Sequence, residues 1–256
     1  MHLSIKTLII AATFLAVGLD GGGARAGSAN GPADVGARYV DVLDMHGAPR
    51  TPTDRSFNIF FDAGSWHGYS LPPTGDSASG FVGPFVHSLG DGQWVGARFA
   101  EVALQDAGSG KSVALTPVAG HAAPGYLVRR FSAPDLSMRQ TLFFADSWHA
   151  LVQIELTATK ARNVRLSVSG LAMPQQQARI ANGGHIVVQT FAHSNSRLTT
   201  RLHAAGIPGY RVTLSGADYR IALDRPLSLK AHQTTTIFVE QTLIYDAKVE
   251  QPVPVD

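Results

Sequence analysis

From Arg98 onward the chain is built of short runs in which apolar and polar residues alternate, with Gly, Pro, Asn and Asp at the breaks. A period of two places the apolar side chains on one face of a strand, and regularly spaced runs of this kind predict an all-β fold, a large antiparallel β-sandwich. No stretch keeps a helical period long enough to predict a major helix. The runs expected to form strands are residues 99–104, 111–115, 126–131, 136–144, 151–157, 164–168, 185–191, 198–203, 210–214, 219–223 and 235–244.

Glycine-containing breaks between these runs predict hairpin turns. Asn182-Gly183 and Gly216-Ala217-Asp218 place residues that tolerate positive φ between alternating runs. Residues 108–112 read GSGKS and end like a phosphate-binding loop, but Gln105 stands where the first glycine of that motif belongs, and strands flank the segment. A hairpin turn is therefore the favoured interpretation of residues 108–112, and nucleotide binding the alternative.

The N-terminal residues predict export. Residues 1–26 combine Lys6, an apolar run and a small-x-small ending, which is the pattern of a secretory signal peptide. We expect a flexible leader over residues 27–37, the sandwich domain over 38–248, and the start of a linker over 249–256. The implied location is periplasmic or secreted, with no membrane association once the signal is removed.

The composition of the chain limits the classes of partner and cofactor that can be expected. The chain has 21 Lys and Arg against 19 Asp and Glu, and loss of the predicted signal removes two basic residues and one acidic residue, leaving a charge of +1. No basic stripe stands out, so no nucleic-acid partner is predicted. The chain has no cysteine, and its histidines lack the spacing of metal-binding motifs, so no disulfide, metal or other cofactor is expected.

Residues 57–73 read FNIFFDAGSWHGYSLPP and follow a Gly47-Ala48-Pro49 element. This run resembles the N-terminal sandwich domain of bacterial glycoside hydrolase family 63 alpha-glucosidases, in which F-N-x-F-F-D-x-G-x-W-H-G-x-x-L-P follows G-A-P. The likeness extends from about Tyr39 to the end of the chain and is strongest between residues 47 and 83. The resemblance implies a non-catalytic domain that packs on a helical catalytic barrel and shapes its substrate site. These 256 residues do not contain that barrel.

No catalytic residue is predicted. Glycoside hydrolysis normally needs two carboxyl groups across the scissile bond. In the resembled family these groups lie in the helical barrel, and no residue here matches its motifs. A second segment, residues 143–149, echoes the F-F-D-x-G-S-W-H run without its flanks and is not interpreted as a repeat. The carboxylates considered lie mostly in ordinary strand or turn contexts and are Asp62, Glu101, Asp146, Glu155, Asp224 and Glu240.

The candidate site residues are Asp62, Trp66, His67 and Tyr69, which offer aromatic faces and polar tips suited to a sugar ring or to another domain. The alternative is that the aromatic residues of this run serve packing and that Asp62 caps a turn. Trp94 is a second candidate for an exposed aromatic side chain. Three functions stay open: the N-terminal domain of a truncated family-63-like alpha-glucosidase, a free-standing exported carbohydrate-binding module, and a small complete glycosidase.

Overall fold

The computed structural model describes residues 39–173, 178–182, 185–192, 194–206, 209–216 and 218–246. The signal peptide, the leader and the linker predicted from the sequence lie outside these residues. The described chain forms strands, turns and loops and no helix, which confirms the predicted all-β class. Accordingly, no helix of the described residues has the length and apolar character needed to cross a membrane.

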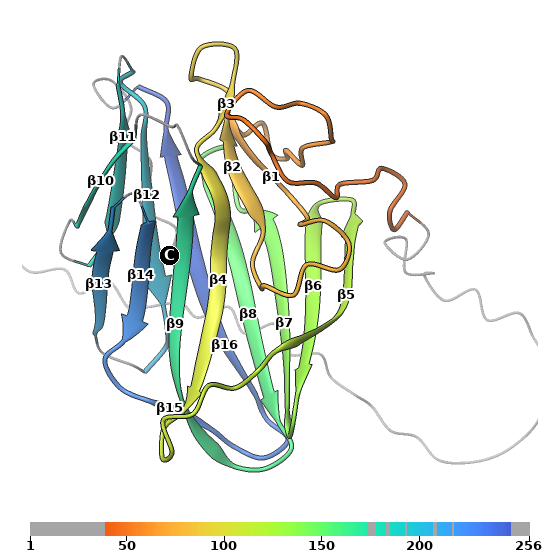
Figure 1. The fold of residues 1–256 in the computed structure, drawn as a ribbon, viewed down its shortest axis with the longest axis vertical. Helices are drawn as coiled ribbons and strands as arrows, with labels where there is room; N and C mark the ends of the chain where they lie inside the picture. The colour runs from red at the N-terminus through yellow and green to blue at the C-terminus, as the bar shows by residue number, and fades with distance from the viewer. Residues whose placement is uncertain are drawn as a thin grey trace, which may run out of the picture. The chain divides into compact units, whose positions relative to one another are not determined.

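The strands belong to three sheets (Figure 1). The strands are β1 (His67–Ser70), β2 (Val82–Val86), β3 (Gln93–Trp94), β4 (Gly96–Asp106), β5 (Thr116–Ala123), β6 (Tyr126–Ala133), β7 (Leu136–Phe144), β8 (His149–Ala158), β9 (Arg162–Ala172), β10 (Ala178–Asn182), β11 (Val187–Phe191), β12 (Arg197–His203), β13 (Tyr210–Ser215), β14 (Asp218–Leu223), β15 (Leu227–Leu229) and β16 (Thr234–Ile244).

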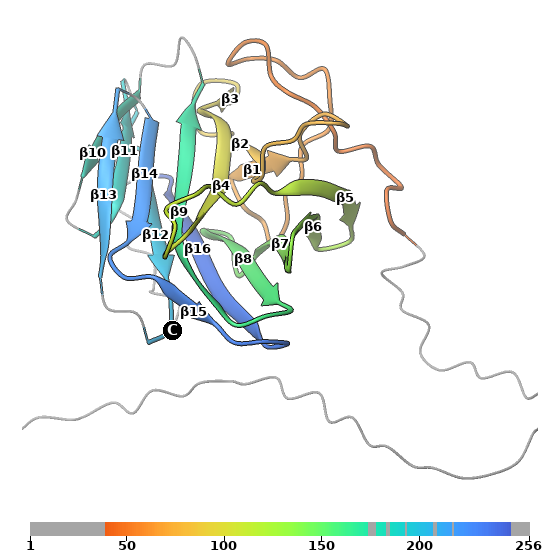
Figure 2. The same ribbon diagram turned by 60° about the horizontal axis from the view of Figure 1, so that its bottom comes forward.

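Two large antiparallel sheets form the sandwich. The eight-stranded sheet has the order β10-β11-β12-β16-β8-β7-β6-β5, and the five-stranded sheet has the order β13-β14-β9-β15 with β4 also paired to β9. Figure 1 looks onto β13, β14, β9 and β4, with β16 and β8 behind them, and Figure 2 shows the same layers after a turn of 60°. The small sheet β1-β2-β3 carries the end of the motif of residues 57–73.

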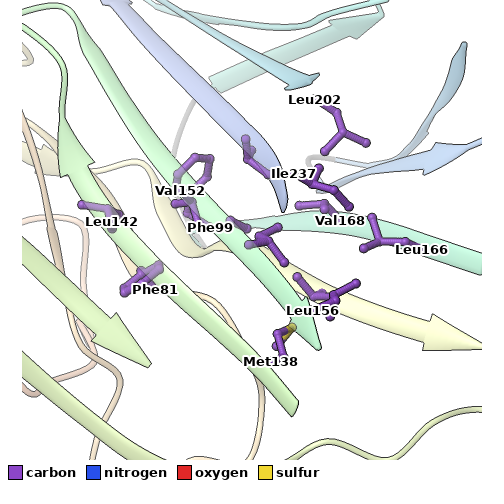
Figure 3. Packing of buried hydrophobic residues seen from close by; sticks show 14 of the residues in the cluster. Phe81, Phe99, Met138, Leu142, Val152, Leu156, Leu166, Val168, Leu202 and Ile237 are labelled. Carbon is purple, nitrogen blue, oxygen red and sulfur yellow. The ribbon is translucent and has the colours of Figure 1, made fainter. Parts of the chain in front are cut away.

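The core forms because the alternating residues of the two sheets face each other. In β8, Val152, Ile154 and Leu156 are fully buried while the residues between them are only partly covered. In β9, which belongs to the opposite sheet, Val164 and Val168 are likewise fully buried. Figure 3 shows side chains from β7, β8, β9, β12 and β16 meeting in one cluster. Burial of this apolar surface is the main source of stability in a chain without disulfides.

Most of the predicted strands are confirmed, and one is wrong. Residues 111–115 contain no strand; Ser112 makes only an isolated bridge with Gln105, as the chain returns from β4. Strands β1, β2, β3, β5, β10 and β15 were not predicted. The reason is clearest in β1 and β2, since every residue in them is buried and no alternation remains for a sequence pattern to detect.

The predicted hairpin turns are confirmed where they fall within the described residues. The GSGKS segment is a tight turn, in which the Asp106 amide donates to the Lys111 carbonyl oxygen at 2.9 Å and the Ser109 amide donates to the Asp106 carboxylate at 2.9 Å. Gly216 has a φ of 62° and lies between the paired residues Ser215 and Asp218, which confirms that turn. Gly183, the second predicted turn residue of the other hairpin, lies outside the described residues.

Candidate functional site

The motif folds back on itself, and residues 67–70 in its second half form strand β1. Phe60 and Tyr69 pair through two backbone hydrogen bonds of 2.7 and 3.0 Å. The return is made at Ala63 and Gly64, which have φ angles of 51° and 72°. Glycine adopts this left-handed conformation without steric cost, which suits Gly64, whereas Ala63 adopts it against the preference of a residue with a Cβ. The hairpin exposes its tip and buries its base.

Asp62 holds the tip of this hairpin and is exposed. Its side chain accepts a hydrogen bond from the Ala63 amide at 2.7 Å, and its carbonyl oxygen accepts one from the Ser65 amide at 2.9 Å. These are the contacts of a turn-forming aspartate, as in the packing alternative. Because the side chain stays open to solvent, its predicted part in binding stays a prediction.

Trp66 lies at the surface beside two aromatic side chains that the sequence did not reveal. Its ring centroid is 5.6 Å from that of His87 and 5.3 Å from that of Tyr245. Trp66 is 49% exposed and Tyr245 46% exposed. We call Trp66, His87 and Tyr245 the aromatic cluster. Its members precede β1, follow β2 and follow β16, so the ends of three strands bring together residues that no sequence spacing connects.

Tyr69, by contrast, is fully buried below the surface. Its hydroxyl donates to the Gln241 side-chain oxygen at 2.6 Å, and the Gln241 amide nitrogen donates to the Thr200 hydroxyl at 3.0 Å. Burial raises the pKa of the Tyr69 hydroxyl well above its ordinary value. This chain of hydrogen bonds ties β1 to β16 and β12. Tyr69 is a neutral, structural hydrogen-bond donor in this conformation.

His67 is fully buried as well, and neither ring nitrogen has a hydrogen-bond partner among the described residues. Its ring packs edge-on against Tyr69 and against Phe144, which belongs to the segment of residues 143–149 that echoes the motif. Burial lowers the pKa of His67 to about 3; the Gln241 backbone and Asp146 oppose this shift, and His149 adds to it. His67 is therefore neutral at physiological pH and supports the surface rather than forming it.

An apolar groove of about 370 Å³ lies beside the tip of the hairpin. Phe61 and Asp62 line it from the motif, Val42 and Leu43 from the segment before the motif, and the β5–β6 turn from the other side. Val42 is 69% exposed and Leu43 56% exposed, so these aliphatic side chains are uncovered. We call this feature the apolar groove.

Trp94 is a packing residue and not an exposed one, which is the packing alternative for the aromatic residues. Trp94 has no exposed surface, its ring stacks on Phe57 at a centroid distance of 5.2 Å, and its indole nitrogen donates to the Asp54 carbonyl oxygen at 2.7 Å. It pairs with Phe85 in the small sheet. Nothing in the sequence shows that the segment before the motif folds over the ring.

Four of the carboxylates considered, Asp146, Glu155, Asp224 and Glu240, contact cations, imidazoles or amides. Glu155 contacts Arg139 at 3.6 Å and Asp224 contacts Arg211 at 3.8 Å. Burial opposes ionisation of Asp146, but hydrogen bonds from the Trp148 amide and from His149 hold its pKa below the ordinary value. A glycosidase acid needs a raised pKa, and the shift here has the opposite sign.

Glu240 behaves in the same way. Its carboxylate lies 2.8 Å from the His203 ring nitrogen, and this hydrogen bond lowers the pKa of Glu240. Among the described residues no group of three or more His, Asp or Glu side chains is arranged to hold a metal ion. On and beside the motif the structure presents two exposed features, the aromatic cluster and the apolar groove.

A β-sandwich that presents an aromatic motif of this kind fits the accessory domain of a carbohydrate-active enzyme. The comparison with protein families agrees. Residues 47–206 match the family described as "Glucosidase YgjK, N-terminal", which is more than half of the chain, so the chain belongs to that family. The match begins at Gly47, the first residue of the Gly-Ala-Pro element.

Several solved structures resemble this chain at low identity, and one of them, at a TM-score of 0.50, shows the same fold. "Polysaccharide Lyase BACCELL_00875" is 11% identical with a TM-score of 0.50, covering 73% of this chain and 34% of that chain. "Putative kojibiose phosphorylase from human microbiome" is 11% identical with a TM-score of 0.49, covering 74% of this chain and 30% of that chain. The Slr1438 protein from Synechocystis sp. PCC 6803 is 11% identical with a TM-score of 0.48, covering 79% of this chain and 100% of that chain. The chain thus spans about a third of the first two proteins.

Proposed function

We propose that this chain is a non-catalytic N-terminal domain that packs on a helical glucosidase domain and shapes its substrate site. The observation that carries the proposal is the uncovered aromatic cluster on a motif typical of the family. Trp66 and Tyr245 are each about half exposed although their rings contact one another. Rings fixed in this way lose little conformational entropy on binding, which is the character of interface anchors. The signal peptide predicted for residues 1–26 would carry such a domain to the periplasm or the medium.

The apolar groove supports the same proposal. Val42, Leu43 and Phe61 present an aliphatic and aromatic surface with only Asp62 as a charged neighbour in the lining. A surface of this composition suits the side of another folded domain better than it suits a sugar, whose hydroxyl groups would find few partners there. Together the two features describe a docking face with the motif at its centre.

A free-standing carbohydrate-binding module is the second candidate. The tilted pair of Trp66 and Tyr245 favours it, because an exposed aromatic face can stack on the C–H face of a sugar ring. The two candidates differ in what the cluster contacts. In the first it contacts protein, and in the second it contacts a neutral glycan directly.

The decisive experiment mixes this chain with the helical catalytic domain of a family-63 alpha-glucosidase produced without its own N-terminal domain. We expect a complex in sedimentation velocity, and its affinity should fall at least about tenfold in Trp66→Ala. Val118→Ala is the matched control, since Val118 is an exposed apolar residue on β5 outside both features, and it should leave the affinity unchanged. Alone, the chain should not hydrolyse maltose, kojibiose, nigerose, trehalose or an aryl alpha-glucoside.

Three results would overturn the proposal. Hydrolysis by the isolated chain that a single Asp or Glu substitution abolishes would reveal an active site in the sandwich. Absence of any complex, together with binding of malto-oligosaccharides that Trp66→Ala removes, would establish the carbohydrate-binding module instead. Complex formation that is insensitive to Trp66→Ala would move the docking face away from the motif.

A further inference from the structure

A second concave surface lies on the outer face of the five-stranded sheet, built by β4, β9, β13 and β14. It encloses about 420 Å³, and polar side chains make most of its walls. We call it the arginine groove. Its lining comprises Ala103, Leu104, Gln105, Ser112, Arg165, Leu166, Ser167, Arg211, Arg220, Ala222, Leu223 and Asp224. No residue of the motif contributes to it.

Strand register explains why this part of the sheet is hollow. Ala103 pairs with Ser167, and Ser167 pairs with Ala222, so three small outward-facing residues lie in one row across β4, β9 and β14. Arg220 stands on one side of this row and Arg165 on the other, each two residues along its strand. A floor of small side chains between long ones forms a trough that runs across the strands.

The walls are positively charged. Arg165 and Arg220 are exposed and have no ion pair among the described residues. Arg211 contacts Asp224 only at 3.8 Å, at an exposed position where such a pair is weak. Elsewhere arginines of this chain do have carboxylate partners, as Arg98 has in Asp76 at 2.6 Å. The groove therefore holds three guanidinium groups against one carboxylate.

We propose that the arginine groove binds an acidic oligosaccharide, one that carries a carboxylate or sulfate group on more than one sugar residue. Guanidinium groups bind both anions through paired hydrogen bonds. Arg165 and Ser169, the cross-strand partner of Arg220, are four residues apart on β9, roughly 13 Å along the strand. A sugar chain that lies along the trough would therefore have one guanidinium group on each side, so that anionic groups on both of its edges would meet an arginine.

The remaining lining fits a sugar chain bound by charge and hydroxyl contacts. Ser167 and Ser112 offer hydroxyl groups and Gln105 offers an amide, which can bond to sugar hydroxyls. No aromatic side chain lines the groove, so it lacks the stacking surface that a neutral glycan requires. The site is thus distinct in residues and in ligand from the aromatic cluster, and it stands whether or not that cluster meets a catalytic domain.

The test is calorimetric titration of the whole chain with oligogalacturonate, a heparin oligosaccharide, maltohexaose and single-stranded DNA, at low and at physiological salt. We expect one or both acidic oligosaccharides to bind and maltohexaose not to bind. Replacing both Arg165→Gln and Arg220→Gln should weaken binding at least about tenfold. The paired control, Arg130→Gln with Arg197→Gln, removes two exposed arginines from the eight-stranded sheet and should change affinity less than about twofold.

A third variant separates groove shape from charge. Ala222→Tyr fills the floor of the groove without altering its charge, and an aromatic residue is well tolerated on a strand. It should weaken binding about as much as the double arginine variant, with an unchanged melting temperature as evidence of folding. Preference for oligogalacturonate would assign carboxylate recognition, and preference for heparin would assign sulfate recognition. The proposal would be overturned if neither acidic oligosaccharide binds, or if the control pair weakens binding as much as the Arg165 and Arg220 pair does. It would also be overturned if single-stranded DNA binds as tightly as the acidic oligosaccharides and Ala222→Tyr leaves that binding unchanged.

Discussion

The motif region and the arginine groove lie on the same sandwich and differ in how the chain builds them. Asp62, Trp66, His67 and Tyr69 are close in sequence, yet the fold separates them into an exposed pair and a buried pair. Arg165, Arg211 and Arg220 are spread along the chain, yet strand pairing brings them to one hollow. The four motif residues are close in sequence and do not form one surface, whereas the three arginines are far apart in sequence and do.

The difference follows from the geometry of a strand. Asp62 and Trp66 precede β1, whereas His67 and Tyr69 lie in β1, where every residue is buried, so a motif that enters this strand buries that part of itself. Residues that share an outer face are instead related by register across strands. A contiguous motif can be recognised in the sequence, whereas a surface formed by residues from several paired strands has no local sequence pattern.

The largest expected effect contrasts two tryptophans. Trp94→Ala should lower the free energy of unfolding by about 3–5 kcal/mol, because it removes a fully buried ring and leaves the Asp54 carbonyl unpaired. Trp66→Ala should cost about 1 kcal/mol, since half of that ring is already in water. Urea denaturation of both variants measures the difference. Equal losses would remove the distinction between support and surface on which the proposed docking face depends.

The second effect concerns acid stability. The pKa of His67 in the folded chain is about 3, below the ordinary 6.5, so the unfolded chain binds a proton that the folded chain excludes. The His67 contribution is complete above pH 6.5 and is lost as the pH falls toward 3. Between pH 7 and pH 4 this loss amounts to about 3 kcal/mol.

Asp146 and Glu240, whose pKa values are lowered, also lose their stabilising contributions in acid, so a variant is needed to isolate His67. His67→Leu fills the buried site with an apolar side chain that cannot titrate. Its stability difference between pH 7 and pH 4 should be smaller than that of the unaltered chain by about 3 kcal/mol. Identical pH profiles in denaturation experiments would show that His67 accepts a proton in the folded state.

The smallest effect is expected at the arginine groove. The double variant Arg165→Gln and Arg220→Gln should change the free energy of unfolding by less than about 0.5 kcal/mol, because both side chains are exposed and take part in no ion pair among the described residues. A stability loss above about 2 kcal/mol would mean that these arginines serve the fold, and it would remove the contrast with the buried half of the motif.

The sequence predicted the class of the fold and most of the strands of the two large sheets, because those strands are half buried and alternate clearly. It could not predict β1 and β2, in which burial on every side leaves no alternation. The wrong strand at residues 111–115 has a related cause, since Val113 and Leu115 are apolar although the segment only closes a turn.

For the site, the sequence by itself singled out residues 57–73, which lie within the range 47–206 that the family matches. Only the tertiary structure decided which of its side chains reach the surface, and that His87 and Tyr245 join Trp66 there. The physical reason is that local sequence fixes composition and turn chemistry. Exposure, register and hollows depend on which strands meet, and those contacts join residues far apart in the chain.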